Sequence, residues 1–546
     1  MRPARGHRPG AAGGGADNAP RAALPARSGL WHDDDVPDRL SSLDASFLYL
    51  EEATTAMHVG SVMIFGPAGE PDRPPRARAG AHPAAAVFDY DRLVVLIAQR
   101  IAFAPRYRQR VRDVPGHLGS PVWVDDEQFD LAYHVRRSAL PRPGTDEQLQ
   151  ELVARIQPRV LDRRRPLWEV YLVEGLSGGR FALVTKVHQA LVDGEGTPDI
   201  AHLLLDEVPL VGAPAGAVEQ PWQPSIAPGD LELVAGALVD AVRRPSQVVE
   251  TVRAGLADVQ AVGGRVLAGL GGVAGAMART AARPAPSSPL NAEIGTTRRW
   301  VMVRTDLADY RQVRLQVSQC TRSPYVTDVT VNDVALATVS GGLRTWLLTR
   351  GEALRGGSTV RAMVPISVYE DSRTADPTDP GGIEHARVGS RVTATFVDLP
   401  VGEPSALMRL HRVAYSTRAQ LDTRRMAGAE AIAGVAGFAP PTLHAVGARL
   451  ASAMSRRLFN LVITNVPGPQ QARYVADARL LSSYPVMPLA RGQALAVGLT
   501  SYDGGMYFGL NADREAMPDL DVLGQCLVDA LAELVAAPSR AAEADG

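Results

Sequence analysis

Short runs of apolar residues, bounded by Gly and Ser, mark the clearest elements in the first half of the chain. Residues 168–174 and 181–188 are rich in Val, Leu, Phe and Tyr, which favour strands. Residues 177–179, Ser-Gly-Gly, supply a turn between them, so a β-hairpin is predicted. Residues 58–65 predict a further strand, and residues 90–101 repeat apolar side chains at helical spacing.

The second half shows the same mixture of patterns. Thr330 and Asp333 have the spacing of a capping box ahead of an apolar helix. Residues 391–397 and 494–499 are apolar enough to form strands. Because strands and helices intermix in both halves, we predict an α/β fold with mixed sheets.

Two further helix starts are predicted from capping residues. Ser42 or Asp44 can cap a short helix that runs to Leu50. Thr197 is expected as an N-cap, with Pro198 at the first helical position.

Between residues 213 and 296 the composition shifts to Ala, Gly and Val, which indicates a linker with helical segments. Leu231, Val234, Leu238 and Val242 fall on one face of such a helix. This apolar face either packs within the protein or contacts a lipid surface, as amphipathic helices do.

The chain is therefore predicted to have two folded parts on either side of this linker. Its first residues are Gly, Ala, Pro and Arg without an apolar core, unlike a secretory signal. The predicted divisions are a disordered leader at 1–38, an N-terminal domain at 39–212, the linker at 213–296, a C-terminal domain at 297–535 and a disordered tail at 536–546.

Length and charge agree with two ordinary globular units. The chain has 546 residues, more than one compact core, and a formal charge of −2, which excludes a globally basic nucleic-acid binder. Cys320 and Cys526 cannot form a disulfide framework, and the histidines lack ligand spacing, so no metal is predicted. The longest apolar stretch, residues 266–278, is about half the length of a membrane span. We expect a soluble or peripheral protein.

The most informative segment follows the second strand of the hairpin and runs from Lys186 to Gly194, KVHQALVDG. It resembles the HHxxxDG signature of CoA-dependent and carrier-protein-dependent acyltransferases. Further blocks resemble the bacterial wax ester synthase/diacylglycerol acyltransferase family in the family's order. They are residues 43–48, 57–60, 166–169, 289–291, 294–295, 298–299, 332–333, 364–367, 465–469 and 501–504.

The resemblance implies two domains like chloramphenicol acetyltransferase, with mixed sheets flanked by helices around a central channel. Acyl-CoA, as co-substrate, and an acceptor alcohol would enter from opposite sides, and no bound cofactor is expected. In the family, the second histidine of the motif takes the proton of the attacking hydroxyl, a task that suits imidazole. Asp193 would be chiefly structural, and Gly194 would permit close backbone approach.

This sequence departs from the motif at the second histidine. His188 matches the first histidine, but Gln189 occupies the second position, and an amide cannot act as a base at neutral pH. Adjacent residues of a strand point to opposite faces, so His188 would not simply replace the missing base unless the turn has already begun. His188, Gln189, Asp193 and Gly194 are nevertheless the candidate catalytic set. His188 could instead be a buried core histidine.

Other candidates are assigned from the family blocks. Lys186, the single lysine among 57 basic residues, lies on the strand face of His188 and could meet a CoA phosphate or form a salt bridge. The run of arginines at residues 106–112 is expected to be a solvated surface, with phosphate binding as the alternative. The remaining predicted substrate-binding residues are Asn332, Asp333, Asn465, Pro467 and Gly468, and the predicted structural residues are Pro166, Leu167 and Trp168.

The sequence thus predicts an O-acyltransferase that moves a long-chain acyl group from acyl-CoA to diacylglycerol or a fatty alcohol. Gln189 could impair it. The alternatives are a non-catalytic acyl-lipid-binding protein of the same fold, or a transferase for another alcohol. A cytoplasmic location is expected, with peripheral attachment to the inner membrane or lipid droplets.

Overall fold

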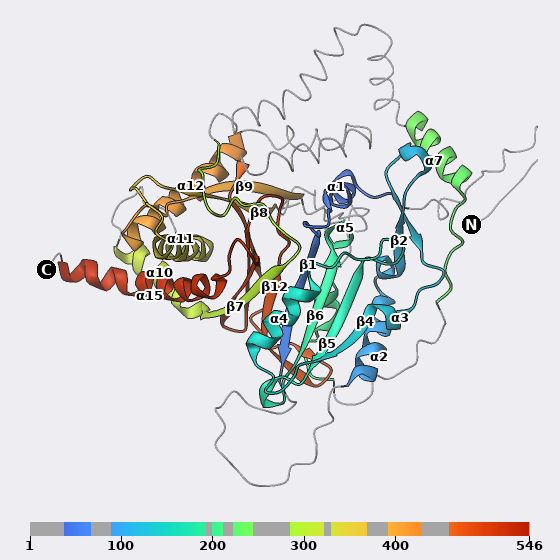
Figure 1. Cartoon of the computed structure of the whole chain (residues 1–546), viewed down its shortest axis with the longest axis horizontal. Helices are drawn as coiled ribbons and strands as arrows, with labels where there is room; N and C mark the ends of the chain where they lie inside the picture. The colour runs from blue at the N-terminus through green and yellow to red at the C-terminus, as the bar shows by residue number, and fades with distance from the viewer. Residues whose placement is uncertain are drawn as a thin grey trace, which may run out of the picture.

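The computed structural model describes residues 38–66, 89–192, 199–210, 222–243, 284–320, 329–368, 391–426 and 458–544. Within these ranges, most strands belong to two six-stranded sheets that lie beside each other (Figure 1). The first has the order β11-β12-β1-β6-β5-β4 and the second β7-β14-β13-β10-β8-β9. Strands β2 and β3 form a separate small hairpin.

The strands of the first sheet are β1 (His58–Phe65), β4 (Val135–Ala139), β5 (Trp168–Glu174), β6 (Phe181–His188), β11 (Tyr474–Val475) and β12 (Ala478–Val486). The strands of the second are β7 (Arg298–Asp306), β8 (Val360–Val368), β9 (Arg391–Leu399), β10 (Leu461–Pro467), β13 (Leu495–Tyr502) and β14 (Gly505–Asp513). The small hairpin consists of β2 (Gln109–Arg112) and β3 (Val122–Asp125).

The described helices of the N-terminal half are α1 (Ser42–Leu50), α2 (Tyr90–Ile101), α3 (Leu131–His134), α4 (Asp146–Ile156), α5 (Gln189–Val192), α6 (Ile200–Leu204) and α7 (Asp230–Arg243). Those of the C-terminal half are α10 (Leu307–Cys320), α11 (Val331–Thr349), α12 (Ala406–Met426) and α15 (Leu520–Ala544). Helices α10, α11, α12 and α15 gather on the outer side of the second sheet (Figure 1).

Several predicted elements are confirmed residue for residue. The strands at 58–65, 168–174 and 181–188 and the helix at 90–101 have the predicted bounds. The capping box is also present, since Thr330 and Asp333 exchange the expected hydrogen bonds at the start of α11. Local sequence was sufficient here because each element carries its own turn or cap.

The two halves share a sheet, which the sequence did not indicate. After β10 the chain leaves the second sheet, and β12 pairs antiparallel with β1, with Gly60 opposite Val486. The other edge of β1 pairs with β6, with His58 opposite His188. The predicted domain boundary at residue 297 therefore does not coincide with the division between the two sheets, because β12 from the second half belongs to the first sheet.

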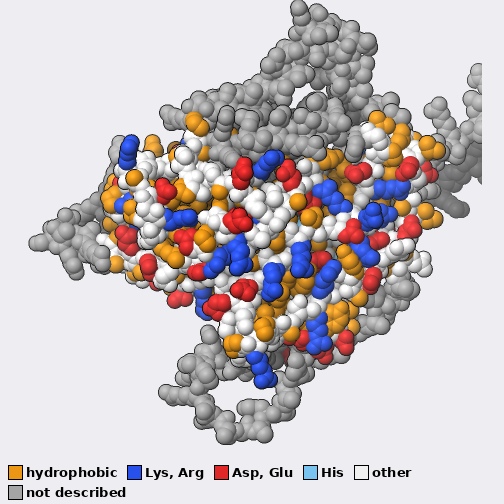
Figure 2. All heavy atoms as spheres, in the orientation of Figure 1, with side chains coloured by type: hydrophobic (Ala, Val, Ile, Leu, Met, Phe, Trp, Pro, Cys, Tyr) orange, Lys and Arg blue, Asp and Glu red, His pale blue; other side chains and the backbone are white. Residues whose placement is uncertain are grey.

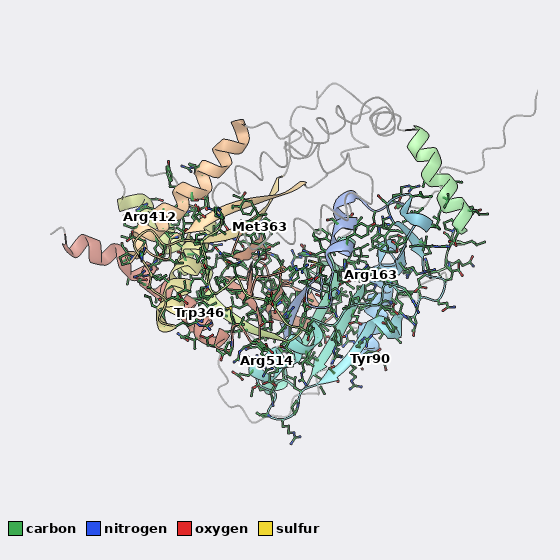
Figure 3. All side chains as sticks on the ribbon, turned by 45° about the horizontal axis from the view of Figure 1, so that its top comes forward. Tyr90, Arg163, Trp346, Met363, Arg412 and Arg514 are labelled. Carbon is green, nitrogen blue, oxygen red and sulfur yellow. The ribbon has the colours of Figure 1, made fainter. Side chains whose placement is uncertain are left out.

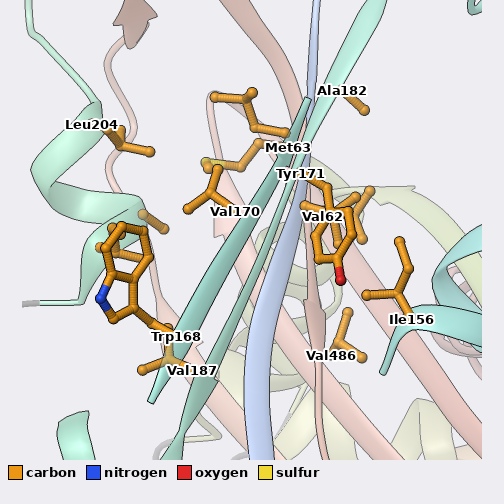
Figure 4. Close-up of a cluster of buried hydrophobic side chains, with 14 of the residues drawn as sticks. Val62, Met63, Ile156, Trp168, Val170, Tyr171, Ala182, Val187, Leu204 and Val486 are labelled. Atoms are coloured by element: carbon orange, nitrogen blue, oxygen red, sulfur yellow. The ribbon is translucent and has the colours of Figure 1, made fainter. Parts of the chain in front are cut away.

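The central strands β5 and β6 of the first sheet are buried on both faces. Figure 4 shows Trp168 and Val170 on one face of the strands, and Val62 and Tyr171 on the other, where Ile156 of α4 packs. Parallel or mixed sheets covered on both faces have nearly continuous apolar strands, as β5 and β6 do.

The caps of α1 and α6 differ from the predicted ones. The cap of α1 is Ser41 rather than Ser42 or Asp44, because the Ser41 hydroxyl accepts from the Asp44 amide at 3.1 Å. Helix α6 begins after Asp199, which caps it. The predicted cap of this region, Thr197 with Pro198, lies outside the described residues, as does the leader up to residue 37.

The predicted tail also differs, because α15 continues to Ala544 instead of ending at residue 535. Five of the residues at 536–546 are Ala, which favours helix, and the helix continues into them.

At the start of α7 the predicted apolar face does not pack within the protein, and the side chains of Leu238 and Val242 lie outside those that the structure describes. Leu231 is 87% exposed, whereas Leu233 and Ala237 are buried and pack against β3. Asp230 pairs with Arg112 of the small hairpin at 2.7 Å.

The visible surface carries no large region of one charge. Figure 2 shows acidic and basic side chains interspersed over both halves on the face in view. Three arginines of the predicted solvated run have protein partners: Arg106 pairs with Asp38 at 2.9 Å, Arg108 lies over the Trp222 ring, and Arg112 pairs with Asp230. These contacts favour a structural role for the run over phosphate binding.

Candidate active site

The motif lies where β6 ends and α5 begins. The backbone N–H of His188 donates to the Leu167 carbonyl at 3.0 Å, and that of Gln189 donates to the Met57 carbonyl at 2.9 Å. The turn is thus fixed between the segments that precede β5 and β1, and residue 189 starts the helix.

The His188 side chain is completely buried. Its Nδ1 accepts a hydrogen bond from the Ala190 amide at 3.1 Å, and its Nε2 lies 3.6 Å from Oε1 of Glu51. Burial lowers the pKa of His188 to about 3, although the Glu51 charge acts in the opposite direction. The imidazole is therefore neutral and has no surface for a substrate.

Gln189 differs from His188 in both exposure and contacts. Its side chain is half-buried, and it has no side-chain hydrogen bond with another described residue. The structure therefore supports the expectation that His188 cannot replace a base at residue 189. Asp193 and Gly194, the other predicted members of the motif, lie outside the described residues.

Lys186 does not have the geometry predicted for a CoA phosphate contact. It is 1% exposed, and its ammonium donates to the carbonyls of Ile156 and Arg159, at the end of α4 and just beyond it. Glu169 lies 3.9 Å away, and burial lowers the pKa of Lys186 to about 8. The prediction of a substrate contact is not supported, because the side chain fastens the end of α4 to β6.

The predicted substrate-binding residues of the second half fall into one neighbourhood. The Asn465 amide donates to Oδ1 of Asn332 at 2.9 Å, which joins the end of β10 to the start of α11. Asp333 accepts from the Thr417 hydroxyl at 2.6 Å as well as capping α11. Its carboxylate is thus satisfied by the protein itself.

A pocket opens beside these residues in the second half. It has apolar walls from Leu336, Val364 and Val397, with Asn332 and Arg418 among its polar lining. The arrangement can hold a ligand with an apolar part and a polar end.

Pro467 ends β10, Gly468 follows it, and the two shape the neighbouring turn. A side-chain carbon at Gly468 would lie 2.3 Å from the Ser501 carbonyl oxygen, so only glycine fits there. This close approach is consistent with a role in backbone geometry.

A second, smaller pocket lies at the junction of the two halves. Its lining includes Ala56 and His58 from the first half and Arg298, Leu489 and Asn511 from the second. We call it the junction pocket. The predicted site residues do not line it.

The predicted structural residues are confined to the core of the first half. Leu167 and Trp168 are fully buried, and Pro166 is buried beside them. The Trp168 indole donates to the Tyr107 carbonyl at 2.7 Å and stacks on the His134 ring.

Sequence reasoning missed Glu51 and Arg163. Arg163, labelled in Figure 3, precedes β5 in the chain, and its guanidinium donates to Oε2 of Glu51 at 2.9 Å. Neither residue belongs to a helical or strand pattern, and they are 112 positions apart, so no local signal could have paired them.

No cluster of three or more His, Cys, Asp or Glu side chains in the described ranges could hold a metal ion. No helix within those ranges is long and apolar enough to cross a membrane.

Similar solved structures define the class of fold. A wax ester synthase/diacylglycerol acyltransferase from Marinobacter aquaeolei VT8 superposes with a TM-score of 0.61 at 27% identity, over 92% of this chain and 100% of that one. Trichothecene 15-O-acetyltransferase TRI3 from Fusarium sporotrichioides gives a TM-score of 0.53 at 11% identity, over 92% and 94% of the two chains, which shows the fold alone. The chain has the two-domain α/β fold of the chloramphenicol-acetyltransferase-like acyltransferases.

Sequence comparison then gives the family. The wax ester synthase/diacylglycerol acyltransferase catalytic domain matches residues 40–335, and the C-terminal domain of the same family matches residues 388–535. The chain belongs to the wax ester synthase/diacylglycerol acyltransferase family.

Two relatives come from Mycobacterium tuberculosis. The probable diacylglycerol O-acyltransferase tgs1 is 34% identical over 510 residues, which cover 92% of this chain and 97% of the relative. The probable diacylglycerol O-acyltransferase tgs3 is 44% identical over 277 residues, 50% of this chain and 95% of the relative. The first similarity extends over both sheets.

Burial of a neutral His188 predicts a specific pH dependence of stability. The unfolded chain binds a proton at this histidine below a pKa of about 6.5, whereas the folded chain does so only near pH 3. Folding is therefore weakened as the pH falls below 6.5, by at most about 1.4 kcal/mol per pH unit.

The measurement is urea unfolding of the native chain and of His188→Asn between pH 7.5 and 5. The native chain should lose stability more steeply than the variant over this range. Parallel pH profiles for the two proteins would contradict the assignment of a buried, neutral imidazole.

Proposed function

We propose that the protein is an O-acyltransferase that moves a long-chain acyl group from acyl-CoA to the hydroxyl of diacylglycerol or a fatty alcohol. The observation that carries the proposal is the family match over both halves, together with the turn that presents residue 189. The names of the mycobacterial relatives favour diacylglycerol as acceptor.

In this reaction the acceptor oxygen attacks the thioester carbonyl. A carbon–oxygen bond forms, the carbon–sulfur bond breaks, and the hydroxyl proton leaves with the CoA thiol. A base beside the hydroxyl typically accelerates such a step about 10²–10⁴-fold. Gln189 can only hydrogen-bond to the reacting groups, and His188 is buried, so positioning of the substrates would carry most of the rate.

Gln189 at the position of the base favours a second candidate function. A protein with Gln189 in place of the base and with His188 buried could bind acyl-CoA or acyl lipid without transferring the chain. Calorimetric binding of palmitoyl-CoA without release of CoA would support this alternative. A measurable transfer rate with another alcohol would instead favour a different acceptor.

Restoring the base should raise the rate. In an assay of CoA release from palmitoyl-CoA with diacylglycerol or hexadecanol, Gln189→His is expected to exceed the native chain by about 10²–10⁴-fold. The reason is that a histidine at this position would be half-buried at the start of α5, as Gln189 is, and could take the proton of the attacking hydroxyl.

The matched control is Gln189→Met, which keeps the size of the side chain but cannot accept a proton. It should be no faster than the native chain. Equal rates for Gln189→His and the native chain, both well above the no-enzyme rate, would contradict the view that residue 189 limits the chemistry.

We also propose that the protein associates peripherally with the surface of a membrane or lipid droplet, where its acceptor would be found. Ile226, just before α7, is 93% exposed, and Leu231, in the first turn of α7, is 87% exposed. Exposed apolar side chains of this kind can insert into the boundary of a lipid surface.

Polar substitution at these positions should weaken that association. The double variant Ile226→Ser, Leu231→Ser is expected to lower co-sedimentation with diacylglycerol-containing liposomes several-fold. Tyr415→Ser, on α12 of the other half, is the control because Tyr415 is also well exposed, at 76%. Unchanged binding of the double variant, or an equal loss in the control, would exclude a docking role for the start of α7.

A further inference from the structure

Three buried side chains converge beside the motif turn. Glu51 follows α1, His58 begins β1 and His188 ends β6. Oε1 of Glu51 lies 3.1 Å from Nε2 of His58 and 3.6 Å from Nε2 of His188. None of these three atoms has a conventional hydrogen-bond partner, and the Glu51 side chain is only 3% exposed. The carboxylate is therefore the nearest acceptor for a proton on either imidazole.

The contacts of His188 decide where its proton lies. Nδ1 accepts the hydrogen bond of the Ala190 amide at 3.1 Å, so Nδ1 carries no proton. A neutral imidazole has one ring proton, which must then be on Nε2, the nitrogen that faces Glu51.

Glu51 is ionised in this environment. Burial alone would raise the pKa of its carboxyl, but the contact with His58, the charges of the two histidines and the Arg163 hydrogen bond lower it to about 2. Arg163 donates to Oε2 from both Nε and Nη2, at 3.2 and 2.9 Å. Oε1 is thereby left to face the two imidazoles.

The other groups around the cluster fit this assignment. Nδ1 of His58 lies 3.4 Å from the Gln157 carbonyl, which can accept a hydrogen bond from an Nδ1–H. Burial and the positive charge of Lys186 both lower the pKa of His58, while Glu51 acts to raise it. The charged side chains that face the two imidazoles are therefore Glu51, Arg163 and Lys186.

We propose that Glu51 is a positioning residue, whose carboxylate keeps the His188 proton on Nε2 so that Nδ1 holds the Ala190 amide and fixes the turn that presents residue 189. The part that residue 189 plays here rests on the proposed acyl transfer. A proton on Nδ1 would face the amide hydrogen and remove this bond, leaving a buried N–H unpaired.

Glu51→Gln tests the proposal because it keeps the shape of the side chain and replaces a hydrogen-bond acceptor with a donor at the Oε1 position. Arg163 donates to the Oε2 position, so it selects the carbonyl oxygen of the new amide there. The amide N–H₂ then occupies the Oε1 position and donates to the Nε2 atoms. The His188 proton is expected to move to Nδ1.

The control is Glu52→Gln, at the next position of the chain. The Glu52 side chain is 46% exposed and pairs with Arg491 at 3.1 Å. This variant removes the same charge and leaves the buried cluster intact.

The measurement is ¹⁵N NMR of histidine-labelled protein, with the His188 ring signals assigned from His188→Asn. The native chain and Glu52→Gln should show protonation at Nε2, and Glu51→Gln protonation at Nδ1. Hydrogen exchange of the peptide that carries Ala190 should accelerate more than tenfold in Glu51→Gln alone. An unchanged tautomer with unchanged exchange would overturn the proposal.

A second pair of variants keeps the test decisive if Glu51→Gln does not fold. The side-chain oxygen of His188→Asn can accept from the Ala190 amide as asparagine caps do, whereas His188→Leu cannot. Protection at Ala190 should survive in the first and be lost in the second. Equal protection in both would overturn the role of His188 as the anchor of the turn.

Activity separates this proposal from the proposed function. In Gln189→His protein, adding Glu51→Gln should lower kcat at least tenfold while KM changes little. If no variant releases CoA but the tautomer still shifts in Glu51→Gln, acyl transfer is contradicted, while the role of Glu51 in setting the His188 tautomer is retained. A tautomer shift with unchanged kcat would overturn the positioning role.

Discussion

The pairing of β1 with two strands from opposite halves is the constraint on which the rest of the structure depends. One edge of β1 bonds to β6 and the other to β12, so the first sheet is complete only when the second half is folded. Gly60 lies in this strand, and a side-chain carbon there would stand 2.0 Å from the Thr185 carbonyl oxygen. The strands can approach this closely only because the residue is glycine.

The same pairing places the motif. His58 and His188 are opposite each other in the β1–β6 register, and the Gln189 amide donates to the Met57 carbonyl just before β1. The end of β1 therefore holds the turn from one side, while the Leu167 carbonyl holds it from the other. Residue 189 is left half-buried, where a substrate could contact it.

Several buried charged side chains lie beside the motif turn and the end of α4. Lys186 fastens the end of α4, and Glu51 lies between Arg163 and the two histidines. Unpaired charges are costly to bury, so each group has a partner of opposite charge or a carbonyl. The arrangement keeps His188 neutral and separates it from the half-exposed Gln189.

Sequence reasoning predicted the elements whose signals are local. The hairpin of β5 and β6, strand β1 and the cap of α11 carry their own turns and capping residues, and the family blocks gave the two-domain fold. The insertion of β12 beside β1 and the pairing of Glu51 with Arg163 join segments far apart in the chain, and neither leaves a local pattern. The role of Lys186 was mispredicted because strand alternation shows which face of the sheet a side chain is on, but not which other segments bury it there.

A crystal structure of Gln189→His with a non-reactive thioether analogue of palmitoyl-CoA would test where the chemistry takes place. We predict that the thioether sulfur lies within contact distance of residue 189, with His188 still buried against Glu51. An analogue whose sulfur occupies the junction pocket beside His58, with residue 189 uncontacted, would contradict the assignment of the active site.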